Sequence, residues 1–406
     1  MEELSELART AGAVIVETVV QNRERLDPAT LIGRGKLAEI RERVAATGTD
    51  VLIFDGDLTP TQQRNVETIA DCRVVDRTQL ILDIFARHAR TREGQLQVEL
   101  AQLNYLLPRL TGRGVEMSRL GGGIGTRGPG ETQLEVDRRR IRRRITLLEK
   151  SLETVRRQRM HRRSRRATVP VPTIALAGYT NTGKSTLFNQ LTQARVTASP
   201  QMFATVDPTL RLLELPSRRR VLLSDTVGFI RHLPHTLIKA FRATLEEVCE
   251  ADLILLVSDC SSPNRTQQEE DVRKVLEEIG AQDKPILQAW NKMDLLTPAE
   301  RSALRPQEDG VPISALTGEG VDDLLHAIDR RLTVDPIERV HLRFAQRQGR
   351  ELSWVYEYGR VLRREDKNGR IDVEAEVPQS LRNRLQAFVT RNDPAPAGPL
   401  RGASRA

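Results

Sequence analysis

A loop suited to binding phosphate is formed by Gly178-Tyr179-Thr180-Asn181-Thr182-Gly183-Lys184-Ser185, with Thr186 directly after it. It follows an apolar, strand-like run and precedes a helix-like one. The two glycines let the backbone curl so that its N–H groups point at an anion, and the helix adds the positive end of its dipole. We expect Lys184 to neutralise the β- and γ-phosphates of a nucleotide and the Ser185 hydroxyl to bind Mg²⁺. A pattern this short also occurs where a glycine-rich loop merely precedes a helix, so segments further along the chain decide between the two.

A second segment whose residues could take part in chemistry follows the strand-like run Val221 to Ser224. It is Asp225-Thr226-Val227-Gly228. Asp225 can hold Mg²⁺ through a water molecule. The bare N–H of Gly228 can approach a γ-phosphate more closely than any residue with a side chain, so the loop after it can report whether that phosphate is present. With the phosphate loop, this segment predicts a site for a nucleoside triphosphate and Mg²⁺.

Two further segments could select the base: Asn291-Lys292-Met293-Asp294, after the run Ile286 to Trp290, and Ser314-Ala315-Leu316, at the end of a later strand. The Asp294 carboxylate can accept hydrogens from N1 and N2 of guanine, and Lys292 can lie across the purine ring. Ser314 to Leu316 can place a backbone N–H near guanine O6. All four segments stand where strands of one parallel sheet end, which is where ligands bind in such folds. Together they predict a guanine-nucleotide-binding domain similar to the Ras-like GTPases.

The predicted fold class is α/β, with these residues in a central doubly wound parallel sheet over residues 171–334. Residues 1–77 alternate strand-like pieces, beginning with Ala13 to Val20, and helix-like pieces, which predicts a small α/β domain. Residues 335–390 contain a helix and two strands joined at Asn368-Gly369, a dipeptide that favours a type I′ turn, and they predict a small α+β domain. Residues 391–406 are rich in Pro, Gly, Ala and Arg, so we expect a disordered tail.

Residues 78–168 predict a long antiparallel helical hairpin. Leucines recur every three or four residues from Leu96 to Leu110, and apolar residues from Leu134 to Val155 continue this spacing in a second helix. Two helices with such seams can pack against each other. The tip between them, 111–130, is glycine-rich and longer than a helix connection needs, which indicates a probe. A flexible linker is the alternative, although the interleaved arginines are unlike an inert spacer.

Positive charge is concentrated in the second helix of this hairpin. The 406-residue chain has a net charge of +8, and Arg138 to Arg166 alone contribute 14 basic residues against 2 glutamates. Such a run typically binds a polyanion, more often a nucleic acid than a membrane surface. A solvated helix face is the alternative. No apolar run is long enough to span a membrane and the N-terminus lacks an export signal, so we expect a cytoplasmic protein without stable membrane insertion. Three widely spaced cysteines predict buried, reduced thiols.

Over about residues 10–380 the chain resembles the HflX family of GTPases. The resemblance rests on the phosphate loop, on Phe203-Ala204-Thr205-Val206-Asp207-Pro208-Thr209-Leu210, on Asp225-Thr226-Val227-Gly228-Phe229-Ile230 and on the tip sequence from Gly122 to Thr132. It implies that Thr205 is the switch I threonine that reaches Mg²⁺ when GTP is bound, with Thr209 as the second choice, and that Phe203 and Ala204 also contact the nucleotide. The residues expected to act on the reacting phosphate are Lys184, Thr205 and Gly228.

The resemblance also implies what the protein acts on. Family members hydrolyse GTP to GDP and bind the large (50S) ribosomal subunit and its rRNA, where they split or rescue stalled or stressed ribosomes. The loop of the helical hairpin is then directed toward the peptidyl transferase region, and the chain acts as a monomer. Two alternatives remain open: a GTPase of ribosome assembly, and an RNA-binding scaffold in which nucleotide mainly regulates binding.

One residue departs from the commoner GTPase pattern. Phe229 follows Gly228, where many relatives place a glutamine that orients the attacking water. An aromatic ring cannot hold that water by hydrogen bonding, so we expect slow intrinsic hydrolysis that the ribosome stimulates. Asn181 stands where K⁺-stimulated GTPases carry an asparagine that helps to hold the cation, which makes K⁺ an expected cofactor beside Mg²⁺. A plain turn residue is the alternative for Asn181.

Overall fold

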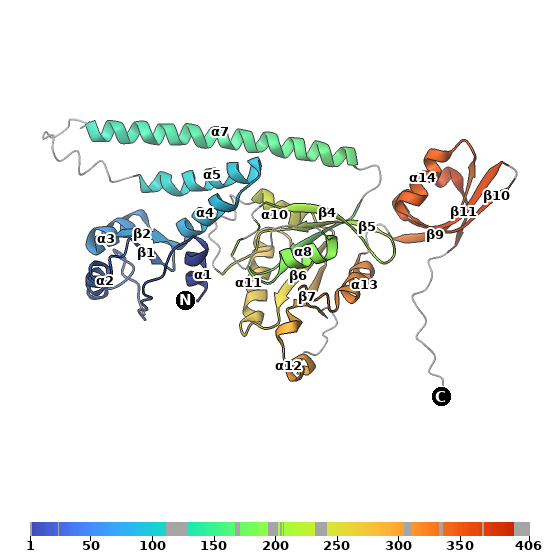
Figure 1. Cartoon of the computed structure of the whole chain (residues 1–406). Helices are drawn as coiled ribbons and strands as arrows, with labels where there is room; N and C mark the ends of the chain where they lie inside the picture. Colours follow the sequence, from blue (N-terminus) through green and yellow to red (C-terminus); the bar gives the residue numbers. More distant parts are fainter. Residues whose placement is uncertain are drawn as a thin grey trace. The chain divides into compact units, whose positions relative to one another are not determined.

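A computed structural model of the chain shows two compact units (Figure 1). It describes residues 2–22, 24–110, 129–166, 171–193, 202–203, 205, 207–231, 242–303, 310–332, 336–367 and 369–393. The N-terminal unit comprises Met1–Arg159 together with Ser199–Asp207 and Ile230–Leu245, and the C-terminal unit comprises Met160–Ala198, Pro208–Phe229 and Glu246–Ala406. Among the helices that the structure describes, none combines the length and the apolar character needed to cross a bilayer.

The N-terminal unit begins as a small α/β arrangement, as predicted. Its elements are α1 (Glu2–Thr10), α2 (Arg34–Thr47), β1 (Val51–Phe54), α3 (Pro60–Ala70), β2 (Arg73–Asp76) and α4 (Arg77–His88). Strands β1 and β2 pair in parallel, and Leu37, Phe54 and Val66 bury their side chains between the strands and the helices. Helix α3 starts where it does because Thr59 and Gln62 form a reciprocal capping box.

The predicted strand from Ala13 to Val20 is wrong. This segment joins no strand in the described part of the chain, and Val14, Val16 and Val20 are 89%, 58% and 60% exposed. Its β-branched residues favour extended backbone, but a strand also needs a neighbouring ladder of hydrogen bonds. No local pattern supplies that neighbour.

The predicted helical hairpin is confirmed in α5 (Arg92–Arg109) and α7 (Pro129–Arg166), which Figure 1 shows running beside each other. On the α7 seam Leu148 is 1% exposed, whereas the neighbouring arginines face solvent. Arg144 of α7 donates to both carboxylate oxygens of Glu99 in α5, at 2.6 and 2.8 Å, which ties the two arms together. The predicted tip falls on residues 111–130, of which 111–128 lie outside the described residues.

A six-stranded sheet forms the centre of the C-terminal unit, in the order β4-β5-β3-β6-β7-β8. The strands are β3 (Thr173–Ala177), β4 (Thr209–Glu214), β5 (Arg220–Asp225), β6 (Leu253–Asp259), β7 (Ile286–Asn291) and β8 (Gly310–Pro312). The helices that follow them are α8 (Lys184–Thr192), α10 (Arg242–Cys249), α11 (Arg265–Glu278), η1 (Met293–Leu295), α12 (Pro298–Ala303) and α13 (Val321–Arg331). All neighbouring strands are parallel except the edge strand β4, which runs antiparallel to β5. The predicted parallel sheet is therefore confirmed, with an antiparallel edge that the sequence reading did not include.

The chain ends in a small antiparallel sheet with the order β10-β11-β9-β12. Its elements are β9 (Ile337–Ala345), α14 (Gly349–Tyr358), β10 (Arg360–Lys367), β11 (Arg370–Pro378), α15 (Gln379–Arg384), η2 (Gln386–Phe388) and β12 (Val389–Asp393). This arrangement confirms the predicted α+β domain. The predicted tail from residue 391 begins too early, because residues 391–393 belong to β12, and residues 394–406 lie outside the described residues. The three cysteines are free, but each is only partly buried rather than buried.

Candidate nucleotide-binding site

The phosphate loop joins β3 to α8, as the sequence predicted. Gly178 and Gly183 have φ values of +152° and +91°, which residues with a side chain rarely adopt. A Cβ on Gly183 would also collide with the Asn291 amide nitrogen. Gly183 stands directly before Lys184, the first residue of α8, so the backbone N–H groups at the start of that helix face the same loop.

Lys184 is the main cation of this loop, and it is only 6% exposed. Its ammonium donates hydrogen bonds to the carbonyl oxygens of Gly178 at 3.1 Å and Tyr179 at 2.6 Å. Burial lowers the pKa of Lys184 from 10.5 to about 8, and the nearby Asp225 carboxylate opposes that shift. Phosphate oxygens would bring negative charge to a cation that now has mainly neutral carbonyls around it.

Binding of GDP is expected to take up protons above pH 8. Phosphates in contact with Lys184 would stabilise its charged form and raise its pKa from about 8, so at pH 9 the bound protein would hold a proton that most of the free protein lacks. The affinity for GDP therefore falls above pH 8, by up to about tenfold per pH unit, whereas below pH 8 the group is already protonated. Calorimetry of GDP binding without Mg²⁺, in two buffers of different ionisation enthalpy at pH 7 and pH 9, measures this uptake.

The matched control for this experiment is Lys184→Arg, because a guanidinium stays protonated at both pH values. The guanine base titrates equally in both proteins, so the difference between them isolates Lys184. Equal proton uptake by the two proteins at pH 9 would show that Lys184 is already protonated in the free state.

Ser185 and Asp225, the predicted Mg²⁺ residues, lie side by side. The Ser185 hydroxyl donates to Asp225 Oδ2 at 2.8 Å, and Asp225 is fully buried at the end of β5. A hydroxyl and a carboxylate are the hard oxygen donors that Mg²⁺ prefers, and Mg²⁺ sites commonly use one or two protein groups beside phosphate oxygens and water. The residues present therefore fit a Mg²⁺ ion. Phe203 and Thr205 belong to the N-terminal unit, and Ala204 lies outside the described residues.

Gly228 lies against the phosphate loop. A Cβ built on Gly228 would stand 2.9 Å from Thr180 Cα, closer than real Cβ atoms come, and 3.0 Å from Lys184 Nζ. Within the same segment the Thr226 hydroxyl donates to the Leu176 carbonyl at 2.6 Å, so Thr226 holds β5 to β3. Val227 is 7% exposed.

The structure gives Phe229 a packing role that the sequence reading missed. Its side chain is 2% exposed. Its N–H donates to the Gly178 carbonyl at 3.0 Å, and its carbonyl accepts from the Thr180 N–H at 2.7 Å. Phe229 thus fastens the segment after β5 to the phosphate loop by a backbone bridge. Its buried aromatic ring stands at the sequence position where many GTPases carry a water-orienting glutamine.

Asn291 connects three of the predicted loops. Its amide nitrogen donates to the Thr182 carbonyl at 2.8 Å, and its side-chain oxygen accepts from the Ala315 N–H at 2.8 Å. A carboxamide donates through its NH₂ group and accepts through its oxygen, so one side chain can bridge two backbone groups. Asn291 therefore braces the phosphate loop against the segment that was predicted to face guanine O6.

The remaining base-site residues also meet in the structure. Asp294 Oδ1 accepts a hydrogen bond from the Ser314 hydroxyl at 2.5 Å, and Lys292 forms an ion pair with Asp259 at 2.7 Å. Leu316 is 75% exposed, and Met293 is 7% exposed. Asp259 was not predicted from the sequence as a site residue. Asp259 ends β6 just as Asp225 ends β5, so its position at the end of a strand could have identified it.

The doubly wound sheet, the glycine-rich loop before α8 and the Ser185–Asp225 pair define the protein as a P-loop GTPase. The family model described as "50S ribosome-binding GTPase" matches residues 173–292. Models described as "GTP-binding GTPase N-terminal" and "GTP-binding GTPase Middle Region" match residues 1–86 and 88–166, and "HflX C-terminal domain" matches residues 300–390. The chain belongs to the HflX family of GTPases, which hydrolyse GTP.

Curated relatives support this assignment along most of the chain. GTPase HflX of Caldanaerobacter subterraneus subsp. tengcongensis is 47% identical over 389 residues, covering 96% of this chain and 90% of the relative. GTPase HflX of Escherichia coli is 46% identical over 374 residues, covering 89% and 88%. Among solved structures, a GTP-binding protein of Sulfolobus solfataricus in complex with GDP is 27% identical with a TM-score of 0.42, covering 82% of this chain and 95% of that one.

Proposed function

We propose that the protein is a GTP-hydrolysing switch that binds the large (50S) ribosomal subunit and helps to split or rescue stalled or stressed ribosomes. The observation that carries the ribosomal part is the exposed arginine face of α7, in a chain whose GTPase domain matches a family described as 50S ribosome-binding. RNA phosphates attract such a face without reading sequence. The GTPase site supplies the change of state that a switch needs.

The five arginines between positions 139 and 144 of α7 divide into two groups. Arg139 pairs with Glu135 of the same helix at 2.9 Å, and Arg144 pairs with Glu99 of α5. Arg140, Arg142 and Arg143 are exposed, and no carboxylate among the described residues pairs with them. These three guanidinium groups are therefore available to an RNA backbone.

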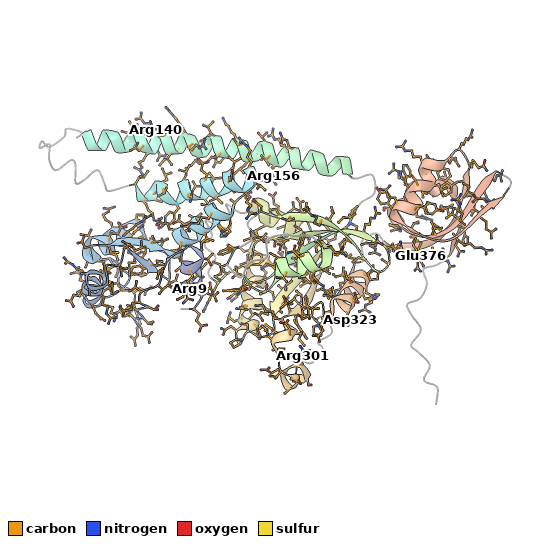
Figure 2. All side chains as sticks on the ribbon, viewed as in Figure 1. Arg9, Arg140, Arg156, Arg301, Asp323 and Glu376 are labelled. Carbon is orange, nitrogen blue, oxygen red and sulfur yellow. The ribbon has the colours of Figure 1, made fainter. Side chains whose placement is uncertain are left out.

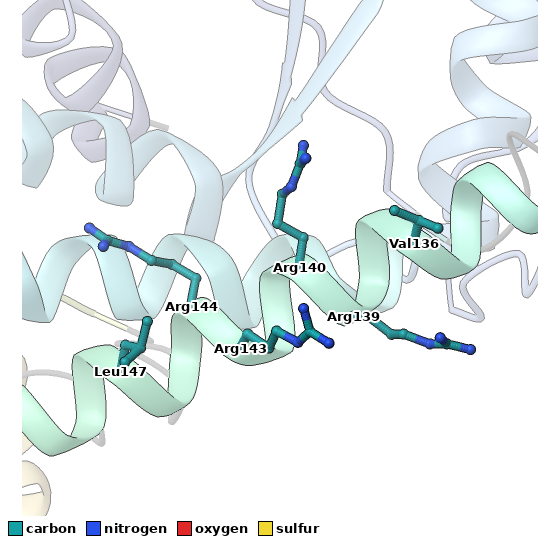
Figure 3. Close-up of a pocket in the computed structure, with 6 residues that line it drawn as sticks. All are labelled: Val136, Arg139, Arg140, Arg143, Arg144 and Leu147. Atoms are coloured by element: carbon teal, nitrogen blue, oxygen red, sulfur yellow. The ribbon is translucent and has the colours of Figure 1, made fainter.

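The available arginines stand beside exposed apolar side chains. Val136 and Leu147 are 50% and 57% exposed, and with Arg139, Arg140, Arg143 and Arg144 they line a surface hollow (Figure 3). Figure 2 marks Arg140 and Arg156 among the side chains along the helix. Exposed apolar groups between cations suit RNA, which offers sugar and base surfaces beside its phosphates.

Co-sedimentation with 30S, 50S and 70S particles tests the proposed function. The protein should pellet with 50S subunits in a non-hydrolysable GTP analogue and much less in GDP, and it should convert 70S particles into subunits. Binding to 50S precursors but not to mature subunits would favour ribosome assembly instead. Equal binding in both nucleotides would favour a scaffold.

Replacing Arg140, Arg142 and Arg143 together with glutamine should weaken 50S binding and flatten its salt dependence. Each lost phosphate contact lowers the slope of log K against log salt by about 0.7 to 0.9, so the triple variant should lose about 2 to 3 from the slope. GTP affinity should not change. Binding measured at several salt concentrations gives the slope.

A charge-matched control is the triple replacement of Arg343, Arg363 and Arg364 with glutamine. These arginines are held by Asp372, Glu365 and Asp366 on the terminal antiparallel sheet. An equal loss of slope in both triple variants would mean that net charge, rather than the α7 face, governs the binding.

At the nucleotide we propose that Lys184 contacts the β- and γ-phosphates and that Ser185 and Thr205 bind Mg²⁺, with Asp225 acting through water. Asp294 reads guanine, and Gly228 approaches the γ-phosphate. The buried Phe229 supports slow hydrolysis by the protein alone, because it cannot orient water. Bound Mg²⁺ would neutralise charge on the phosphates; the protein's residues hold and orient them.

Faster hydrolysis in K⁺ than in Na⁺ is expected if Asn181 holds a monovalent cation. Asn181 is exposed and has a φ of 61°, a left-handed conformation that suits a turn and also turns its side chain out of the loop core. Rates measured at equal ionic strength, with and without 50S, decide between the two roles. Equal rates in both salts under both conditions would leave Asn181 as a turn residue.

A further inference from the structure

Asp207 caps the N-terminus of helix α5 within the N-terminal unit. Its carboxylate accepts hydrogen bonds from the backbone N–H groups of Arg90 at 2.8 Å and Thr91 at 2.7 Å, and also from the Thr91 hydroxyl. Thr91 is itself the N-cap residue of α5 and accepts from the Gly94 N–H at 3.0 Å. A carboxylate at a helix N-terminus also gains from the helix dipole. We call this set of contacts the Asp207 clasp.

Gly94 makes room for the clasp. A Cβ built on Gly94 would collide with Asp207 Oδ1 and lie 3.1 Å from Asp207 Cγ. Gly94 has no left-handed φ, and it stands in the first turn of an 18-residue helix. Alanine favours a helix interior by up to about 1 kcal/mol over glycine, so α5 by itself gains nothing from glycine here. The feature of this position that excludes a side chain is the Asp207 carboxylate.

A second anchor lies four residues before Asp207. Phe203 is 3% exposed, and its ring packs edge-on against Phe85 of α4 with a centroid distance of 4.6 Å. Met202 is also 3% exposed, and its N–H donates to the Thr10 hydroxyl at 3.3 Å. Thr205 therefore stands between two anchors on the N-terminal unit.

We propose that the Asp207 clasp couples the nucleotide site to the α5–α7 hairpin, with Asp207 as a positioning residue for Thr205. This inference rests on the proposed function, which assigns Thr205 to Mg²⁺ and the hairpin to the ribosome. Thr205 is two residues from Asp207, a span of about 7 Å of extended chain, so a displacement of Thr205 by nucleotide reaches the cap of α5. By linkage, an occupied hairpin must alter nucleotide affinity by the same factor.

The test uses Gly94→Ala in the full chain, which expels the Asp207 carboxylate without touching a predicted nucleotide residue. Gly35→Ala is the matched control, because Gly35 lies in α2 with nothing within 4 Å of a built Cβ. The measurement is the Kd for a fluorescent non-hydrolysable GTP analogue, with and without 50S. In the wild-type protein we expect the Kd without 50S and the Kd with 50S to differ by a ratio of about fivefold or more. This ratio should be near 1 in Gly94→Ala and should keep its wild-type value in Gly35→Ala.

Asp207→Ala is the second variant and removes the same contact from the other side. Two changes that act through one contact are not additive, so the double variant should show the same ratio as either single one. Thermal unfolding checks that each variant is folded. A merely structural role for the clasp would lower stability and leave the ratio unchanged.

The outcomes separate the two proposals. If wild-type protein shows nucleotide-dependent 50S binding and both Gly94→Ala and Asp207→Ala keep the wild-type ratio, the coupling role of the clasp is wrong and the proposed function stands. If the wild-type protein itself shows no difference between nucleotides, the proposed function fails first, and the coupling with it.

Discussion

Replacing Gly228 with alanine is expected to slow GTP hydrolysis by about a hundredfold. The added Cβ would stand 2.9 Å from Thr180 Cα, which is backbone and cannot swing aside, and 3.0 Å from Lys184 Nζ. The segment after β5 must then move away from the phosphate loop. Misplacement of reacting groups by about 1 Å can cost about 10² in rate. GDP has no γ-phosphate for Gly228 to approach, so its affinity should stay within about tenfold of wild type.

Single-turnover hydrolysis and GDP titration measure the two effects separately. Gly56→Ala is a suitable control, because a Cβ on Gly56 meets nothing within 4 Å and its φ is not left-handed. Hydrolysis at the wild-type rate in Gly228→Ala would show that Gly228 does not need to approach the γ-phosphate. If GDP affinity falls as much as the hydrolysis rate, the substitution has instead distorted the phosphate loop around Lys184.

Asp294→Asn is expected to reverse the preference for guanine over xanthine nucleotides. The carboxylate can accept two hydrogens from guanine, and hydrogen bonds to a charged group contribute about 1.5 to 3 kcal/mol each, so we expect GTP binding to weaken by about 10² or more. The amide of asparagine can donate to the xanthine O2. Ser314, which now donates to Asp294 Oδ1, can donate equally to the amide oxygen and keep the side chain in place.

Competition of GTP, XTP and ATP for one labelled nucleotide measures this preference. Asp283→Asn is the isosteric control, since Asp283 is exposed in the turn after α11. If the Asp294→Asn variant still prefers GTP over XTP, Asp294 does not select the base. Wild-type protein that bound ATP as tightly as GTP would contradict the guanine assignment altogether.

The four loop segments could be found from sequence because their chemistry restricts residue type at short range. A phosphate loop needs glycine where φ is positive, as at Gly178 and Gly183, and a cation directly at the start of the next helix. Each segment also follows an apolar run, and a run of that kind in a parallel sheet ends at the binding edge. The helical hairpin was equally accessible, because its seam repeats every three or four residues.

Tertiary structure decided the contacts between residues far apart in the chain. No local pattern distinguishes Gly94 from other helix glycines, since the Asp207 carboxylate that requires it comes from more than a hundred residues away. Asn291 was predicted for the nucleotide, but its bracing of Thr182 and Ala315 depends on three loops meeting. Phe229 likewise gained its place only through the bridge to the phosphate loop.

Dependence on distant contacts also explains why the predicted strand from Ala13 to Val20 is wrong. A segment rich in β-branched residues favours extended backbone, and that much the amino-acid sequence settled by itself. Whether an extended segment becomes a strand depends on a partner edge, and β1 pairs with β2 instead. Residue chemistry thus determined which groups could bind GTP, and folding decided which of those groups also hold the loops and helices around it.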